Sequence, residues 1–182
     1  MKLGIFVGSF NPIHNGHIKV MDFLINNNYV DRIIIVATTS YWDKKIDVSL
    51  NDRINMIKCI NKDYLIVEDK LNNIEYTYML LNALSKKFKG DELYLIMAAD
   101  NIVNFDKWKN YQEILNYKVI ILNRDNIDIH NYTDKYNSSN FIVIQDFEYI
   151  DISSTKLRSN LDNNYLDNKV LKYIKDNKLY QW

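Results

Sequence analysis

The chain of 182 residues is 47% hydrophobic and 25% charged, and its 23 basic side chains balance 23 acidic ones. A chain of this length buries roughly 70% of its unfolded surface, so its hydrophobic core needs no disulfide or metal support. The neutral charge balance excludes a whole-molecule field that would draw the protein to nucleic acid or to an anionic membrane, and we expect neither as a partner.

Strands and helices are predicted in alternation along the chain. β-Branched and apolar runs indicate strands at residues 2–7, Arg32–Ala37, 64–67, 93–98, 119–122 and Phe141–Ile144. Helical spacing or capping signals indicate helices at residues 18–25, after Ser49, from a Thr77 cap to Leu84, at residues 153–160 and at Asn168–Asp176. The polar residues 123–140 are predicted to form a loop.

This alternation predicts the fold class. Parallel strands joined by helices require right-handed crossovers, so the order favours an α/β fold with one Rossmann-like, doubly wound, mostly parallel sheet and helices on both faces. No repeat or linker interrupts the pattern, and residues 1–182 are expected to form a single domain. Ligands of such sheets bind beyond the carboxyl ends of the strands. Chemistry is therefore expected in the loops at residues 8–16, 38–46 and 98–101.

The number of cysteines and the length of the apolar runs indicate the cellular compartment in which the protein is expected. The single cysteine, Cys59, cannot form an internal disulfide, which favours a reducing compartment and excludes a cysteine-rich zinc site. The N-terminal apolar run ends at Gly8 without the hydrophobic segment and cleavage site of a signal peptide. No apolar stretch approaches the roughly 20 residues that cross a bilayer. We therefore expect a cytoplasmic protein.

The segment GSFNPIHNGH at residues 8–17 is the most informative part of the chain. Gly8 allows a sharp turn out of the first strand, and Pro12 stiffens the loop that follows. His14 and His17 are three residues apart, so their rings share one face if a helix begins near His14. Amide groups and the helix dipole favour an anion at such a start. These residues together favour a phosphate site.

Other readings of the histidine pair stay open from the residues alone. Two histidines at this spacing also suit a metal ion, but His130 is the only further histidine and lies in the polar segment. A purely structural role also stays open. The sequence lacks both a GxGxxG fingerprint and a GxxxxGK[ST] loop, so neither of those phosphate-binding motifs applies.

Two signatures resemble those of the nucleotidyltransferase superfamily. GSFNPIHNGH is similar to its HxGH motif, and residues 152–158, ISSTKLR, resemble its ISSTxxR motif about 140 residues later. Intervening segments resemble bacterial nicotinate-mononucleotide adenylyltransferases: residues 98–101, Lys107-Trp108, residues 113–115, residues 75–78, the helix from Ser49 to Arg53 and the closing residues 170–180. The resemblance covers nearly the whole chain.

The resemblance implies an adenylyl transfer from ATP to nicotinate mononucleotide, with both nucleotides as partners and Mg²⁺ carried on the ATP phosphates. It implies catalytic roles for His14, His17 and Lys44, with Lys45 as the alternative lysine. The implied ATP-binding residues are Gly8, Ser9, Phe10, Asp100, Ser153, Ser154, Thr155 and Arg158. The implied mononucleotide-binding residues are Asn11, Thr77, Trp108, Tyr111 and Arg124. No residue is assigned as a metal ligand, and a homo-oligomer stays open.

Three departures from the family pattern concern the pyridine-nucleotide pocket. The loop at residues 40–45 lacks the usual prolines and histidine, Ala98 replaces a glycine, and Met79 replaces an aspartate. The alternatives are therefore an adenylyltransferase that uses nicotinamide mononucleotide or phosphopantetheine, another cytidylyltransferase relative, or a non-catalytic nucleotide-binding regulator. The retained His14, His17 and Arg158 disfavour the regulator.

Overall fold

The structure is a computed structural model that describes residues 1–39, 48–123, 127–136, 138–159 and 162–180. Six strands form one sheet in the order β3-β2-β1-β4-β5-β6, and every neighbouring pair is parallel. The strands are β1 (Lys2–Gly8), β2 (Arg32–Ala37), β3 (Leu65–Val67), β4 (Glu92–Ala98), β5 (Lys118–Leu122) and β6 (Phe141–Ile144). The predicted doubly wound α/β fold is confirmed.

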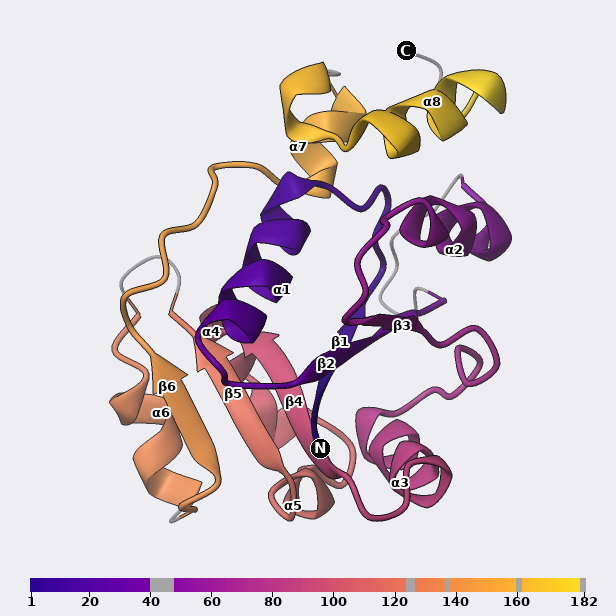
Figure 1. Cartoon of the computed structure of the whole chain (residues 1–182). Helices are drawn as coiled ribbons and strands as arrows, with labels where there is room; N and C mark the ends of the chain where they lie inside the picture. The colour runs from indigo at the N-terminus through magenta and orange to yellow at the C-terminus, as the bar shows by residue number, and fades with distance from the viewer. Residues whose placement is uncertain (40–47, 124–126, 137, 160–161, 181–182) are drawn as a thin grey trace.

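Helices cover both faces of this sheet (Figure 1). The α-helices are α1 (Asn15–Asn26), α2 (Leu50–Lys58), α3 (Thr77–Lys87), α4 (Ala99–Ile102), α5 (Tyr111–Ile114), α6 (His130–Thr133), α7 (Ser154–Ser159) and α8 (Asn168–Asp176). Short 3₁₀ turns are η1 (Phe105–Lys107), η2 (Asp134–Tyr136) and η3 (Asn163–Tyr165). No helix within the described residues is both long and apolar enough to cross a membrane.

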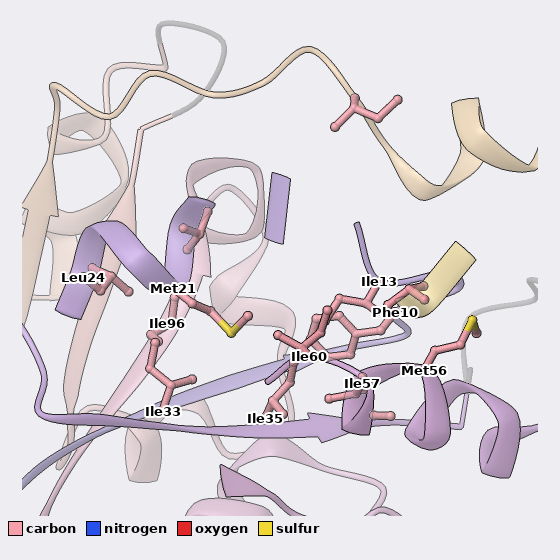
Figure 2. Close-up of a cluster of buried hydrophobic side chains, with 14 of the residues drawn as sticks. Phe10, Ile13, Met21, Leu24, Ile33, Ile35, Met56, Ile57, Ile60 and Ile96 are labelled. Atoms are coloured by element: carbon pink, nitrogen blue, oxygen red, sulfur yellow. The ribbon is translucent and has the colours of Figure 1, made fainter. Parts of the chain in front are cut away.

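Alternate residues of each strand enter two separate hydrophobic clusters, one on each face. In β2, Ile33 and Ile35 join the cluster under α1, α2 and α8, whereas Ile34 and Val36 join the one under α3, α4 and α5. Figure 2 shows the first cluster, in which Phe10 of the loop after β1 lies among side chains from α2. Burial on both faces explains why these strands are apolar at nearly every position.

The strand order reverses between β1 and β4, because the chain builds β2 and β3 on one side of β1 and β4 to β6 on the other. The carboxyl ends of the strands lie at one edge, with Gly8 opposite Ala37 and Ala98 opposite Leu122. The starts of α1 and of α7 lie near this edge of the sheet (Figure 1). This is the switch point where ligands of open α/β sheets bind.

Two local expectations differ from the structure. Thr77 is the first residue of α3 rather than its cap; the cap is Tyr76, whose side chain makes no capping hydrogen bond. Residues 123–140 are not simply a loop, because they contain α6 and η2, anchored by the fully buried Ile129. By contrast, the Ser49 cap of α2 is confirmed, since its Oγ accepts the Asp52 N–H at 3.0 Å.

Candidate active site

A cavity of about 230 Å³ lies at the switch point, between the ends of β1, β4 and β5. Its polar lining consists of His14, His17, Asn101, Ser153 and Ser154. The remaining wall is mostly apolar and comes from the strand ends, from α1 and from Tyr149, Ile150 and Ile152. A concave site with a few converging polar groups on an apolar wall is typical of small-molecule binding.

His14 and His17 form the first turn of α1 by capping each other. The Nδ1 atom of His14 accepts the Gly16 N–H at 3.1 Å, and the Nδ1 atom of His17 accepts the His14 N–H at 3.2 Å. This is a capping box in which histidines replace the usual serine and glutamate. The ring centroids lie 3.8 Å apart. The prediction that the two rings share one face of the helix is confirmed.

The capping box also fixes the proton on each ring. Because both Nδ1 atoms accept an N–H, a neutral ring carries its hydrogen on Nε2. Burial lowers the pKa of His17 well below its ordinary value, and the nearby His14 lowers it further. His17 is therefore a neutral Nε2–H donor at physiological pH. A neutral donor of this kind can donate its Nε2–H hydrogen to a phosphate oxygen without carrying a positive charge.

This lowered pKa predicts a pH-dependent stability. Near pH 6.5 and below, the unfolded chain protonates His17 while the folded protein does not, so the free energy of unfolding falls as pH decreases. The slope contributed by one such group is at most about 1.4 kcal/mol per pH unit. Asparagine places its Oδ1 where Nδ1 lies and does not titrate. We expect His17→Asn to flatten the dependence of unfolding free energy on pH between 7 and 5 in denaturant titrations, and an unchanged slope would contradict the assignment.

The C-terminal motif contacts the loop after β1 directly. Ser154 Oγ donates to the carbonyl oxygen of Pro12 at 2.9 Å, and Arg158 Nη1 donates to the carbonyl oxygen of Asn11 at 2.7 Å. Arg158 Nη2 also donates to Thr155 Oγ1 at 3.1 Å. The two motifs, about 140 residues apart in sequence, therefore meet at one loop. Ser153 Oγ accepts the Lys156 N–H at 3.2 Å, as expected of a residue that caps α7.

In the β1–α1 loop (residues 8–14), the side chain of Phe10 packs in the protein interior. Phe10 has a left-handed backbone (φ 44°) and a fully buried ring, which contacts Phe6 and His17 edge-on with centroids 5.4 and 5.0 Å apart. Any contact of Phe10 with a nucleotide therefore comes from its main chain. Ser9 is exposed. Gly8 suits the turn because an added Cβ would lie 3.1 Å from the Phe10 ring.

Three of the residues expected to bind the mononucleotide, Thr77, Trp108 and Tyr111, do not line this cavity. Trp108 and Tyr111 pack beside the buried Phe105, with centroids 5.6 Å from its ring in both cases. Thr77 begins α3, which packs on α5 through an Asn82–Glu113 hydrogen bond of 3.0 Å. None of these side chains lines the cavity that contains the histidines.

The other expected site residues fall into three cases. Asp100 is exposed in α4 and does not line the cavity, whereas its neighbour Asn101 does. Lys44, with its alternative Lys45, and Arg124 fall outside the described residues. Asn11 is only 4% exposed and holds two C-terminal residues through its oxygen atoms.

No sequence pattern predicts a role for four residues of this region: Arg53, Asn101, Tyr149 and Tyr180. Arg53 is only 2% exposed, and its Nη1 donates to the carbonyl oxygens of Ser9 at 2.5 Å and Thr38 at 2.9 Å. It thereby joins the ends of β1 and β2. The sequence points to Arg53 and Tyr180 only in that both lie in segments that resemble the adenylyltransferases.

The described residues contain no group of three or more His, Cys, Asp or Glu side chains that could hold a metal ion. The histidine pair has no third ligand among them.

Known proteins match the chain over most or all of its length. The cytidylyltransferase-like family model matches residues 5–160. A protein of Borreliella burgdorferi named "Probable nicotinate-nucleotide adenylyltransferase" is 35% identical, covering 99% of this chain and 97% of the relative. A protein of the same name from Flavobacterium psychrophilum is 34% identical over the full length of both chains.

A solved structure shares the fold. The nicotinic acid mononucleotide adenylyltransferase of Plasmodium falciparum, complexed with NaAD, superposes with a TM-score of 0.80 at 23% identity, covering 99% of this chain and 97% of that one. The length-wide sequence matches, the histidine pair and the C-terminal motif all agree with one assignment. The chain belongs to the cytidylyltransferase-like family of nucleotidyltransferases, together with the nicotinate-nucleotide adenylyltransferases.

Proposed function

We propose that this enzyme transfers AMP from ATP to nicotinate mononucleotide, giving deamido-NAD and pyrophosphate. The observation that carries this proposal is the meeting of the two motifs at one loop, through the Arg158–Asn11 and Ser154–Pro12 hydrogen bonds. The names of the full-length relatives supply the reaction and the acceptor. The NaAD bound to the Plasmodium falciparum enzyme is the product expected of the same reaction.

In this reaction, an oxygen of the mononucleotide 5′-phosphate attacks the α-phosphorus of ATP. The bond from that phosphorus to the oxygen shared with the β-phosphate breaks, and pyrophosphate leaves with the electron pair. Such a transfer needs little covalent help, so alignment and charge stabilisation provide most of the catalysis. The Nε2–H groups of His14 and His17 are the proposed donors to the phosphate oxygens as charge moves toward pyrophosphate.

The remaining roles follow the family pattern. Arg158 and the start of α7, from Ser153 to Thr155, are proposed to bind the outer phosphates, and Gly8, Ser9 and Phe10 to approach the nucleotide through their main chain. Asp100 is the proposed ribose contact, and Lys44 the proposed cation over the phosphates. Asn11, Thr77, Trp108, Tyr111 and Arg124 are the proposed mononucleotide residues. Mg²⁺ is proposed to arrive on ATP, where it would neutralise phosphate charge.

Arg158 gives a prediction specific to ATP. Its guanidinium contacts Asn11 and Thr155 through two different nitrogens, an arrangement that an ammonium group does not reproduce. We expect Arg158→Lys to raise the KM for ATP about tenfold or more, the effect of one lost hydrogen bond to a charged group. Steady-state kinetics with each substrate varied in turn measures this. An equal rise in the KM for nicotinate mononucleotide would contradict an ATP-specific role.

Pyrophosphate release tests the proposed function. The purified chain is incubated with ATP and Mg²⁺ and with nicotinate mononucleotide, nicotinamide mononucleotide or phosphopantetheine, and pyrophosphate is measured. We expect the highest kcat/KM with nicotinate mononucleotide, with deamido-NAD formed in equal amount. Faster release with phosphopantetheine, or no release with any acceptor, would refute the proposal.

A further inference from the structure

The end of the chain turns back onto the β1–α1 loop. After α8 ends at Asp176, Lys178 and Tyr180 both adopt left-handed backbone conformations, with φ of 52° and 68°. The Leu179 N–H donates to the Ile174 carbonyl oxygen at 3.0 Å and closes this turn. Left-handed conformations cost side-chain-bearing residues roughly 1 kcal/mol each. Contacts made by the described residues of this turn offset that cost.

Tyr180 makes such a contact with Asn11, 169 positions earlier in the chain. Its hydroxyl group donates to Asn11 Oδ1 at 2.7 Å. The main-chain oxygen of Asn11 accepts from Arg158 Nη1, also at 2.7 Å. Both oxygen atoms of this buried residue are thus held by C-terminal side chains. His14 follows only three residues later.

Burial raises the pKa of Tyr180, and the charges of Arg158 and Arg53 oppose this rise only in part. The phenol stays protonated at neutral pH and keeps its hydrogen for Asn11. Arg53 in turn holds the carbonyl oxygens of Ser9 and Thr38. The loop is therefore held at Ser9 by Arg53 and at Asn11 by Arg158 and Tyr180.

We propose that Tyr180 is a positioning residue of the active site, which fixes the β1–α1 loop through the side chain of Asn11 and so aligns His14 and Arg158 with the phosphates. This proposal rests on the proposed function and adds to it a part for the C-terminal end of the chain. Tyr180 touches no reacting atom in this account. Its effect passes through Asn11.

Tyr173 provides a matched control for a purely structural role, in which Tyr180 only anchors α8. Tyr173 belongs to α8, and its hydroxyl group also makes hydrogen bonds, donating to Asp52 Oδ1 at 2.9 Å and accepting from Asn55 Nδ2 at 3.0 Å. These bonds join α8 to α2 and make no contact with Asn11. Tyr173→Phe therefore removes an anchor of α8 without removing a contact to the loop.

The kinetic test compares Tyr180→Phe with Tyr173→Phe. Removing the Tyr180 hydroxyl group is expected to lower kcat roughly two- to tenfold, the effect of one hydrogen bond. The KM values are expected to change less, because misalignment acts on the transition state more than on substrate binding. Tyr173→Phe is expected to keep kcat within twofold of the unmodified enzyme. A Tyr180→Phe enzyme with unchanged kcat, or an equal loss in both variants, would overturn the proposal.

Hydrogen exchange provides a readout that does not depend on turnover. In Tyr180→Phe, amide exchange is expected to quicken in peptides that cover residues 9–17, and in Tyr173→Phe it is expected to quicken in α2 instead. The same exchange pattern in both variants would count against a loop-positioning role. If the unmodified enzyme released no pyrophosphate, the proposed function would fail, and the exchange pattern would still decide whether Tyr180 holds the loop.

Discussion

Replacing His17 with asparagine is expected to lower kcat about 100- to 1,000-fold, the cost of removing one preorganised donor to a developing negative charge. The Oδ1 atom of asparagine can take the place of Nδ1 and accept the His14 N–H, so the helix start is retained. No atom then lies at the position of Nε2. The loss therefore reports on the donor rather than on folding. Steady-state kinetics measures the loss of kcat, and a thermal unfolding curve measures whether the variant keeps its stability.

His17→Gln is the complementary variant, because glutamine places an amide N–H near the position of Nε2. We expect it to keep more activity than His17→Asn although it fits the capping box differently. Activity in His17→Asn close to that of the unmodified enzyme would contradict the donor role. Equal loss in both variants, accompanied by equal loss of stability, would point to the helix start instead.

Gly16→Ala is expected to lower kcat about 100-fold, although no catalytic group is removed. A Cβ at this position would lie 2.9 Å from both Cε1 and Nδ1 of His14 and 3.2 Å from Ile152. The His14 ring is 5% exposed and bonded to the Gly16 N–H, so it must move and give up part of its cap. A displacement of about 1 Å at a catalytic group is enough to cost roughly 100-fold.

A double-mutant cycle separates this displacement from other effects of the alanine. In a His14→Ala background the ring is absent, and the added methyl group has no ring to displace. We therefore expect Gly16→Ala to have almost no further effect on kcat there, a strong departure from additivity. Full additivity of the two losses would show that Gly16→Ala acts by another route. Alanine is the better helix former, but its contacts with His14 and Ile152 oppose that gain, so thermal unfolding is measured beside kcat.

The fold follows from the sequence most closely where burial determines the residue type. The runs at Arg32–Ala37 and Phe141–Ile144 were predicted with the observed boundaries, because apolar side chains on both faces of each strand pack into the two clusters. The predictions were wrong at positions where tertiary contacts, rather than the local sequence, determine the secondary structure. The cap of α3 is Tyr76, and Ile129 anchors a helix within a segment whose polar composition favours a loop.

The candidate site was predictable where the spacing of residues along one helix determines how their side chains lie. Two histidines three residues apart at a helix start necessarily lie together, and the structure brings them to a centroid distance of 3.8 Å. Arg53 was not predictable in the same way, because it binds the main-chain oxygens of Ser9 and Thr38. Every residue type has a main-chain oxygen, so these contacts produce no sequence pattern. Tyr180 is one of 14 tyrosines, and its partner lies at the other end of the chain.

His14, His17 and Arg158 are proposed to bind one triphosphate. A crystal structure of the enzyme with a non-hydrolysable ATP analogue tests this proposal most directly. We predict the Nε2 atoms of both histidines and a guanidinium nitrogen of Arg158 within about 3.2 Å of phosphate oxygens of a single nucleotide. A phosphate chain bound away from the histidine pair, or contacted by the histidines but not by Arg158, would contradict the account.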